Sequence, residues 1–437
     1  MKTNTQFKET EIGMIPNDWE IVKFSDVAEL KHGYQFRSYD FTKEGIKVFK
    51  ITQIRNNGAI DISSCDFIDG NRLKEFEQVV IKKRDILMAL TGATIGKIAR
   101  FRDIKEPILQ NYRVGNFFPI NELYLSKDYL YQYLSSTFFF NQILARQTQS
   151  AQQNIGKEEI NNMLIILPSI NEQQSIAKIL SDLDSKIERN HQMNKTLEEI
   201  GQAIFKHWFI DFEFPNEKGK PYKSSGGEMV ESELGEIPKG WRVGKLGEIG
   251  TFKNGINYLR NEQGDTEFFI ANVRDIANNK LLLKEGLDKI KIVFKKAREY
   301  LLNQKDILIA RSASPGDVSL VLGDLQNVIY SGFSIRYRLN NPKNYLYLFL
   351  ILQELRDSLS NYSIGTTLQS VNQETLKNMM FCVPADAVLE KFNIIIEQIL
   401  ERTYGNMIQN SSLSQIRDSL LPKLMSGKIR VPVEVRS

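Results

Sequence analysis

Residues 10–33 read TEIGMIPNDWEIVKFSDVAELKHG, and residues 232–255 read SELGEIPKGWRVGKLGEIGTFKNG. At an offset of 222 the two segments share 8 of 24 residues, far more than unrelated segments would. The shared residues include Trp19 with Trp241 and Gly33 with Gly255. Self-similarity at a fixed offset is the signature of a repeated structural unit. The two segments therefore predict that the chain contains one fold twice.

Further matches follow in the same order along the chain. The sequence RDILMA at residues 84–89 corresponds to KDILIA at residues 305–310. Glu158, Asn162 and Pro168 correspond to identical residues 216 positions later. Two copies of a unit of 216 to 222 residues account for the whole length of 437 residues.

Each copy begins with a block of mixed secondary structure. Short apolar runs separated by Gly, Asn and Asp predict strands, turns and some helix in residues 1–169 and again in residues 232–384. Each block is followed by a helical period, in residues 170–210 and in residues 385–437. Residues 211–231 are rich in Lys, Gly and Ser, which is typical of a linker.

The first helix has a clear predicted start. Ser169 and Glu172 have the spacing of a capping box, in which the hydroxyl and the carboxylate both bind free backbone amides. From Ile176 onward, one residue in every three or four forms a regular row that recurs in the second copy. We call this row the helix seam, and its members are Ile176, Leu180, Leu183, Ile187, Asn190, Asn194 and Leu197, with Phe392, Ile396, Ile399, Asn406, Asn410 and Leu413 in the second copy.

Two Asn residues lie at the centre of each row, at equivalent positions. Buried amides cost stability but can fix the register of paired helices, because a slipped register leaves them without partners. The expected fold class is therefore α+β, with two similar α/β domains joined by two long antiparallel coiled-coil helices and an internal pseudo-twofold repeat. The alternative is that each helix covers its own domain and the Asn side chains are solvated.

Composition indicates the cellular compartment and the kinds of site that we do not expect in this chain. Two Cys and three His are too few for a disulfide framework or a structural zinc cluster, so we expect no metal and a reducing, cytoplasmic location. The apolar run at residues 345–352 is far shorter than a membrane span, and the first 20 residues lack the apolar core of a signal peptide. The net charge of +4 neither identifies nor excludes a nucleic-acid partner.

Two motifs that are typical of catalytic chains are absent or incomplete in the sequence. The sequence contains neither NPPY nor DPPY, which would hold a flipped adenine. TGATIGK at residues 91–97 is one residue too short for a P-loop and is followed by Ile98 where a P-loop has Ser or Thr. Asp85 and Asp306 lie in apolar runs that recur in both copies, which favours a structural role over a nuclease site.

The chain resembles the specificity subunits of type I restriction–modification systems. The resemblance rests on the doubled E-x-G-x-I-P-x-x-W segment, on LPSINEQQSIAKIL at residues 167–180 and on SLLPKLMSGKIRV at residues 419–431. It implies that each α/β block is a target recognition domain that reads one half of a split, asymmetric site in double-stranded DNA. It also implies that the helices hold the half-sites apart and recruit two modification subunits, to which restriction subunits are added.

The resemblance further implies that this chain has no catalytic residues and no cofactor of its own. S-adenosylmethionine is expected on the modification subunits, which methylate adenine. Two alternatives stay open on the residues alone. The chain could be a methyltransferase or nuclease with an unrecognised active site, or a helical scaffold that binds only proteins.

Candidate DNA contacts follow from what each side chain can bind. Arg and Lys bind guanine, Asn and Gln bind adenine, and loops with Gly, Ser or Thr allow backbone amides to approach phosphate. In the first domain the candidates are Lys31, Tyr34, Gln35, Arg37, Gln53, Arg55, Asn56, Thr91, Gly92, Thr94, Lys97, Asn111 and Arg113. In the second domain they are Lys253, Asn257, Tyr258, Asn272, Arg274, Arg311, Ser312, Ser314, Ser331 and Arg336. Lys97 corresponds to Asp317, so a phosphate contact at that position is not expected in the second domain.

Overall fold

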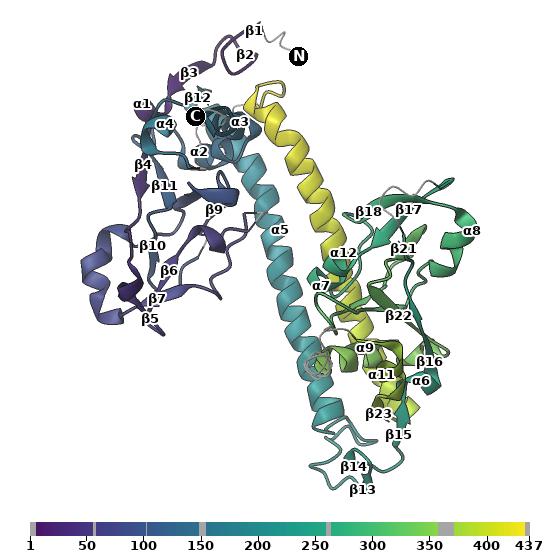
Figure 1. Ribbon diagram of the computed structural model, residues 1–437. Coiled ribbons are helices and arrows are strands. Elements are labelled where there is room, and N and C mark those ends of the chain that lie inside the picture. The colour runs from purple at the N-terminus through teal and green to yellow at the C-terminus, as the bar shows by residue number, and fades with distance from the viewer. Residues whose placement is uncertain are drawn as a thin grey trace. The chain divides into compact units, whose positions relative to one another are not determined.

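The computed structural model describes residues 6–55, 58–101, 103–147, 154–258, 264–356 and 371–432 (Figure 1). The chain forms two compact units. The first comprises Met1–Lys186 with Leu413–Ser437, and the second comprises Ile187–Ser412. Each unit contains one α/β block and parts of both long helices, so the two units can be described one after the other.

The first unit is built on two small sheets. One is antiparallel, in the order β4 (Ala28–His32), β11 (Val114–Pro119), β8 (Ile86–Ala89), β9 (Ile98–Arg100). The other has the order β10 (Ile108–Gln110), β6 (Ile46–Phe49), β7 (Asp66–Ile68), β5 (Phe41–Thr42), with β10 parallel to β6. The remaining strands form the pairs β1 (Phe7–Lys8) with β2 (Ile15–Pro16) and β3 (Glu20–Lys23) with β12 (Leu164–Leu167).

Short helices complete this block. The α-helices are α1 (Phe24–Val27), α2 (Lys127–Leu134), α3 (Thr137–Gln147) and α4 (Lys157–Asn161). The 3₁₀ turns are η1 (Ser38–Asp40), η2 (Ile51–Gln53), η3 (Gly70–Val79) and η4 (Gly92–Thr94).

The second unit repeats this arrangement, except that its second sheet has three strands and no counterpart of β5. Its antiparallel sheet has the order β16 (Gly250–Asn254), β22 (Ser334–Leu339), β19 (Ile307–Ala310), β20 (Val318–Leu320). Its other sheet has the order β18 (Asp288–Ile292), β17 (Thr266–Ala271), β21 (Val328–Tyr330), with β21 parallel to β17. The pairs are β13 (Met229–Ser232) with β14 (Gly235–Pro238) and β15 (Arg242–Lys245) with β23 (Met380–Val383). The strand order thus confirms the internal repeat.

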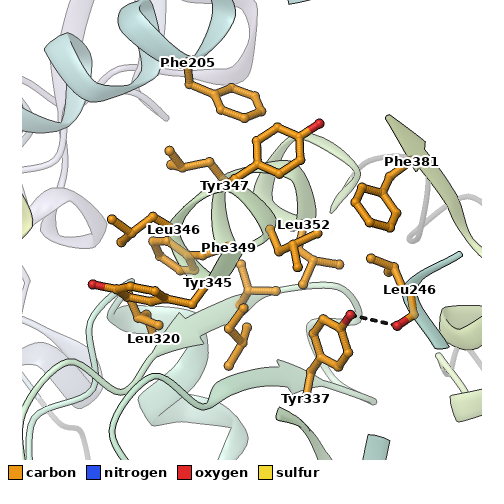
Figure 2. Close-up of a cluster of buried hydrophobic side chains, with 14 of the residues drawn as sticks. Phe205, Leu246, Leu320, Tyr337, Tyr345, Leu346, Tyr347, Phe349, Leu352 and Phe381 are labelled. Atoms are coloured by element: carbon orange, nitrogen blue, oxygen red, sulfur yellow. Dashed lines mark hydrogen bonds between the residues drawn. The ribbon is translucent and has the colours of Figure 1, made fainter. Parts of the chain in front are cut away.

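The helices of the second block are also short. They are α6 (Leu246–Ile249), α7 (Val273–Asn278), α8 (Phe294–Ala297), η6 (Arg298–Tyr300), η7 (Pro342–Asn344), α9 (Tyr345–Glu354) and α11 (Gln373–Asn378). The apolar run that forms α9 is packed inside this domain, where Tyr347 lies beside Phe205 and Phe381 (Figure 2). Among the described residues, no helix is long and apolar enough to cross a membrane.

The repeated residues have equivalent structural tasks. Trp19 is buried and donates its indole N–H to Glu172 over 3.0 Å. Trp241 is also buried and packs against Phe209 and Phe214. Such anchoring of a large aromatic ring explains why Trp is found at this position in both copies.

The long helices are α5 (Ile170–Phe205), which continues as a π-helical turn over Lys206–Ile210, and α12 (Asp386–Met425). In the first unit Ile176 and Leu180 are fully buried, and in the second unit Phe392 and Ile396 are. Leu183, Ile187, Leu197, Ile399 and Leu413 are half-buried.

The central Asn residues all lie in the second unit. The side chains of Asn190 and Asn410 are hydrogen-bonded to each other, and so are the side chains of Asn194 and Asn406. Because residue numbers rise along one helix as they fall along the other, the helices run antiparallel there. The side chains are therefore not simply solvated.

One local prediction was wrong in part. Glu172 does not complete a capping box, because its carboxylate is bound by Trp19 and Arg430, while Ser169 still caps the Glu172 amide over 3.4 Å. Within residues 211–231, the predicted linker, Phe214 is buried and stacked on Tyr222.

Candidate nucleic-acid interface

The second domain contains a groove of about 690 Å³ where the ends of several strands meet. Five of the predicted contact residues line it, namely Tyr258, Asn272, Arg274, Ser312 and Ser331. The other lining residues are Ile270, Val273, Asp288, Lys289, Ile290, Ala313 and Phe333. The fold thus brings together side chains that are up to 75 positions apart in the sequence.

Arg274 is held at this groove by two carboxylates. Its guanidinium donates to Asp275 over 3.2 Å and lies 2.7 Å from Asp288, and these interactions raise its pKa. Asn272 donates to the other oxygen of Asp288 over 3.1 Å. The Arg and Asn side chains are therefore positioned before any ligand binds, which lowers the entropic cost of a contact.

Ser331 and Phe333 form a second wall of the groove. Ser331 is 1% exposed and its hydroxyl has no hydrogen-bond partner among the described residues. The turn that follows presents Phe333, whose side chain is 67% exposed. A buried polar atom without a partner beside an exposed aromatic ring is unusual in a self-contained fold and is typical of a surface that binds a ligand.

Phe333 was not predicted from the sequence. Apart from Gly92, the predicted contacts are polar side chains and tyrosines, so an apolar residue such as Phe333 was not among them. The available signal was its position in a Ser-Gly-Phe-Ser turn, where a buried side chain is unusual. Across the groove, Ala313 has a φ of +63°, a conformation that non-glycine residues adopt rarely and that is concentrated at functional sites.

The other second-domain candidates lie outside this groove. Arg311 lines a separate hollow of about 380 Å³ with Asn254, Asn372, Gln373 and Glu374. Ser314 is half-buried in the β19–β20 turn and Asn257 is exposed beside the groove residue Tyr258.

Two further candidates, Lys253 and Arg336, are occupied by contacts inside the domain. The ammonium of Lys253 binds Glu299 over 3.0 Å, and that bond lowers the pKa of Glu299. Arg336 is 7% exposed and its guanidinium lies over the Tyr330 ring. Arg336 therefore presents little surface to a nucleic acid.

In the first domain, aromatic and basic candidates gather around the turn after β4. Tyr34 is exposed at its edge and packs against Phe36 and Phe76. Arg113 is exposed and donates to the hydroxyl of Tyr112 over 2.8 Å. Gln35 and Arg37 are exposed in the same turn, and Lys31 is exposed on β4.

Two polar candidates of this domain are buried instead. Gln53 is 2% exposed, and its amide accepts from the Lys50 N–H and donates to the Ser64 carbonyl. Asn111 is buried and accepts from the Arg113 N–H over 3.2 Å. Both amides satisfy backbone groups of their own loops, so a contact with a base would compete with these hydrogen bonds.

Arg55 and Asn56 are two neighbouring candidates of the first domain. Arg55 is exposed and forms an ion pair with Asp61, which lies within the same loop, and hydrogen bonds from Ser63 and Arg55 lower the pKa of Asp61. Asn56 lies outside the described residues.

The TGATIGK segment forms a tight turn between β8 and β9 rather than a P-loop. Thr91, Gly92, Thr94 and Lys97 are all half-buried in it. A P-loop leads from a strand into a helix whose N-terminus binds phosphate, whereas this turn leads into a strand.

The second copy of this turn lacks the Lys. The carbonyl of Lys97 accepts from the Ala89 N–H, as that of Asp317 accepts from the Ala310 N–H, so the two positions are equivalent. Asp317 is buried and paired with Arg356 over 2.7 Å. A phosphate contact at this position is thus available to the first domain only.

Asp85 and Asp306 are structural in both domains. Asp85 accepts from Asn116 over 2.8 Å and lies 3.4 Å from Lys127, while Asp306 is bound by Arg338 through both carboxylate oxygens. Each carboxylate also caps its own turn, by accepting from the Lys82 N–H in the first domain and from the Asn303 N–H in the second. No group of three or more His, Cys, Asp or Glu that could hold a metal occurs in the part of the chain that the structure describes.

Comparisons with known proteins agree with this architecture. A family model described as "Type I restriction modification DNA specificity domain" matches twice, at residues 16–199 and 238–410. The MjaIX specificity subunit of Methanocaldococcus jannaschii is 30% identical over 443 residues, which cover 98% of this chain and 97% of the relative. The HindI specificity subunit of Haemophilus influenzae is 23% identical, with 94% of this chain and 100% of the relative covered.

A solved structure supports the fold independently. The type I restriction–modification S subunit from M. genitalium superposes with a TM-score of 0.58 at 16% identity, covering 97% of this chain and 98% of that chain. Because both the family model and the M. jannaschii relative extend over most of the chain, the alternative of a separate methyltransferase or nuclease is set aside. The chain belongs to the type I restriction–modification specificity subunits, a family of non-catalytic chains defined by their DNA specificity domains.

Proposed function

We propose that the two α/β domains read the two halves of a bipartite, asymmetric site in double-stranded DNA. The observation that carries this proposal is that the domains share one strand order but present different side chains at equivalent positions. Asn111 forms a β-bridge to Tyr34, in the turn after β4, and Ser331 forms one to Ile256, in the turn after β16. Arg113 and Phe333 each lie two residues after these bridging residues, so they occupy equivalent positions in the two domains. An arginine and a phenylalanine favour different bases, because one donates hydrogen bonds and the other offers apolar surface.

Strand registers extend this contrast. Asn116 lies opposite Lys31 and Leu87, and Arg336 lies opposite Lys253 and Leu308, so Asn116 and Arg336 are equivalent. The strand order is therefore repeated within the chain, while side chains at equivalent positions differ, both at the exposed Arg113 and Phe333 and at the buried Asn116 and Arg336. A reader of two unequal half-sites needs this combination, and a scaffold that binds only proteins does not.

We further propose that the long helices set the separation of the half-sites and bind two modification subunits. Exposed apolar side chains lie at equivalent positions of α5 and α12: Ile179 and Ile416 in the first unit, and Ile395 and Ile200 in the second. Exposed Ile on a charged helix costs solubility unless a partner covers it. Because the pattern occurs once in each unit, it suits two copies of one partner.

S-adenosylmethionine is placed, in this proposal, on the modification subunits, which methylate adenine. Restriction subunits join the same complex through them. This chain contributes recognition and spacing, and it supplies no reacting group.

The test is the methylation motif of cells that express this chain with its modification subunit. We expect methylated adenine in two short specific sequences separated by a spacer of fixed length, with unlike halves. A continuous palindrome as the motif would contradict the proposal.

A hybrid chain supplies a matched control. Replacing residues 232–384 by a second copy of the first domain keeps both helices and makes the two domains identical. The expected motif is then symmetric, with the same spacer. Retention of the original asymmetric motif by the hybrid would show that the domains do not read the DNA.

A further inference from the structure

A short segment of the second domain carries five cations and no acid. Residues 289–298 read KIKIVFKKAR and extend over β18, α8 and the start of η6. All five cationic residues of this segment are exposed: Lys289, Lys291, Lys295, Lys296 and Arg298. We call this segment the basic edge.

The basic edge is held rigidly from below. Ile292 and Ala297 are fully buried, so the charged residues between and beside them are forced outward. The Phe294 amide donates to Asp265 over 3.0 Å, and this hydrogen bond lowers the pKa of Asp265. Fixed cations lose less entropy when they bind than cations on a mobile tail do.

The basic edge adjoins the groove that Arg274 and Phe333 line. Lys289 lines that groove, and its ammonium binds Glu267 on the neighbouring strand over 2.9 Å. Lys291 lies directly opposite Glu267 in the strand register. One carboxylate therefore faces two lysines, and the edge keeps a net positive charge next to the groove.

The first domain has no equivalent. The corresponding residues, 67–76, read FIDGNRLKEF, with two cations and two acids. Arg72 is bound there to Asp40 over 2.9 Å and to Glu75 over 3.0 Å. The positive charge at this position is thus a property of the second domain alone.

We propose that the basic edge binds the phosphate backbone of DNA beside the half-site read by the second domain. The inference rests on the proposed function, and it adds that the two domains hold DNA unequally. The second domain supplies a larger salt-dependent, sequence-independent share of the binding. Lysine and arginine on a rigid edge suit this task, because binding to phosphate releases condensed counterions.

The experiment measures DNA affinity against salt concentration for the full chain in complex with its modification subunits. The duplex contains the methylated motif. In the test variant, Lys291→Gln, Lys295→Gln and Arg298→Gln remove three exposed cations. In the matched control, Lys218→Gln, Lys220→Gln and Lys223→Gln remove three exposed cations from the segment between the domains.

The slope of log affinity against log salt has a magnitude of about 0.9 for each phosphate that the protein neutralises. We expect the slope of the test variant to fall by about two to three units, the slope of the control to stay the same, and the methylation motif to be unchanged in both. An unchanged slope in the test variant, or an equal fall in the control, would overturn the proposal. If the complex that contains the native chain bound no DNA at all, the proposed function itself would be contradicted.

Discussion

The side-chain amide of Asn190 donates to the side-chain oxygen of Asn410 over 2.8 Å, in the antiparallel pair formed by α5 and α12. Four residues further along α5, Asn194 accepts from Asn406 over the same distance. Asn190 and Asn406 are almost fully buried. Sliding one helix by a turn would separate both pairs and allow only one new Asn pair, which leaves the other two amides without partners, so the pairs favour the observed register.

Asn190→Leu is therefore expected to destabilise the chain by about 1–3 kcal/mol, because the side-chain oxygen of Asn410 stays buried without its donor. The double variant Asn190→Leu with Asn410→Leu should recover much of that loss, since two apolar side chains can pack together. Denaturant unfolding of the two single variants and of the double variant measures the coupling. Strictly additive effects would mean that the two amides do not interact.

Phe333→Ala should weaken binding to the methylated motif while leaving binding to unrelated DNA nearly unchanged. Removal of one base contact costs about 1–3 kcal/mol and relaxes one position of the second half-site. Met380→Ala is the matched control, since Met380 is also an exposed apolar residue of the second domain but lies outside both the groove and residues 289–298. An equal effect of both variants would indicate a general loss of domain stability.

The guanidinium of Arg430 is bound to Glu172 and Asp18 and lies over the ring of Trp19. Arg430→Ala leaves the carboxylate of Glu172 buried without its countercharge, which should destabilise the chain by on the order of 2–3 kcal/mol. Lys428→Ala removes an exposed cation two residues away and should have almost no effect. Denaturant unfolding distinguishes the two variants, and similar losses would argue against a specific role of Arg430.

The same contact predicts a dependence on pH. The hydrogen bond from Arg430 lowers the pKa of Asp18 in the folded chain. Stability from this ionised carboxylate is fully present above the ordinary Asp pKa of about 3.9 and is lost as the pH falls through the lower folded value. The stability advantage of the native chain over Asp18→Asn should therefore shrink as the pH falls below about 4. Measurement of unfolding between neutral and acidic pH checks this, and a constant difference would contradict it.

Periodic features were predictable because they depend on spacing along the chain. Examples are Trp19, which recurs as Trp241, and the Asn residues of the helix seam. Whether a single polar side chain is exposed or hydrogen-bonded inside the fold was not predictable in the same way. Gln53 reads as an exposed adenine contact, yet the backbone of Lys50 and Ser64 captures its amide inside a folded loop. Only the three-dimensional path of the loop decides whether such an amide faces solvent.

Gly255 is one of the residues that the two copies share, and the structure gives a steric reason for it. A Cβ added at Gly255 would overlap the backbone of Ser331, as one added at Gly33 would overlap the backbone of Gln110. Gly255→Ala should displace the turn that carries Phe333 and weaken recognition of the second half-site. Gly405→Ala is the control, since this helical glycine has open space around it and alanine favours a helix by up to about 1 kcal/mol. If Gly255→Ala left the affinity for the methylated motif at the native level, the turn would not be a part of the recognition surface.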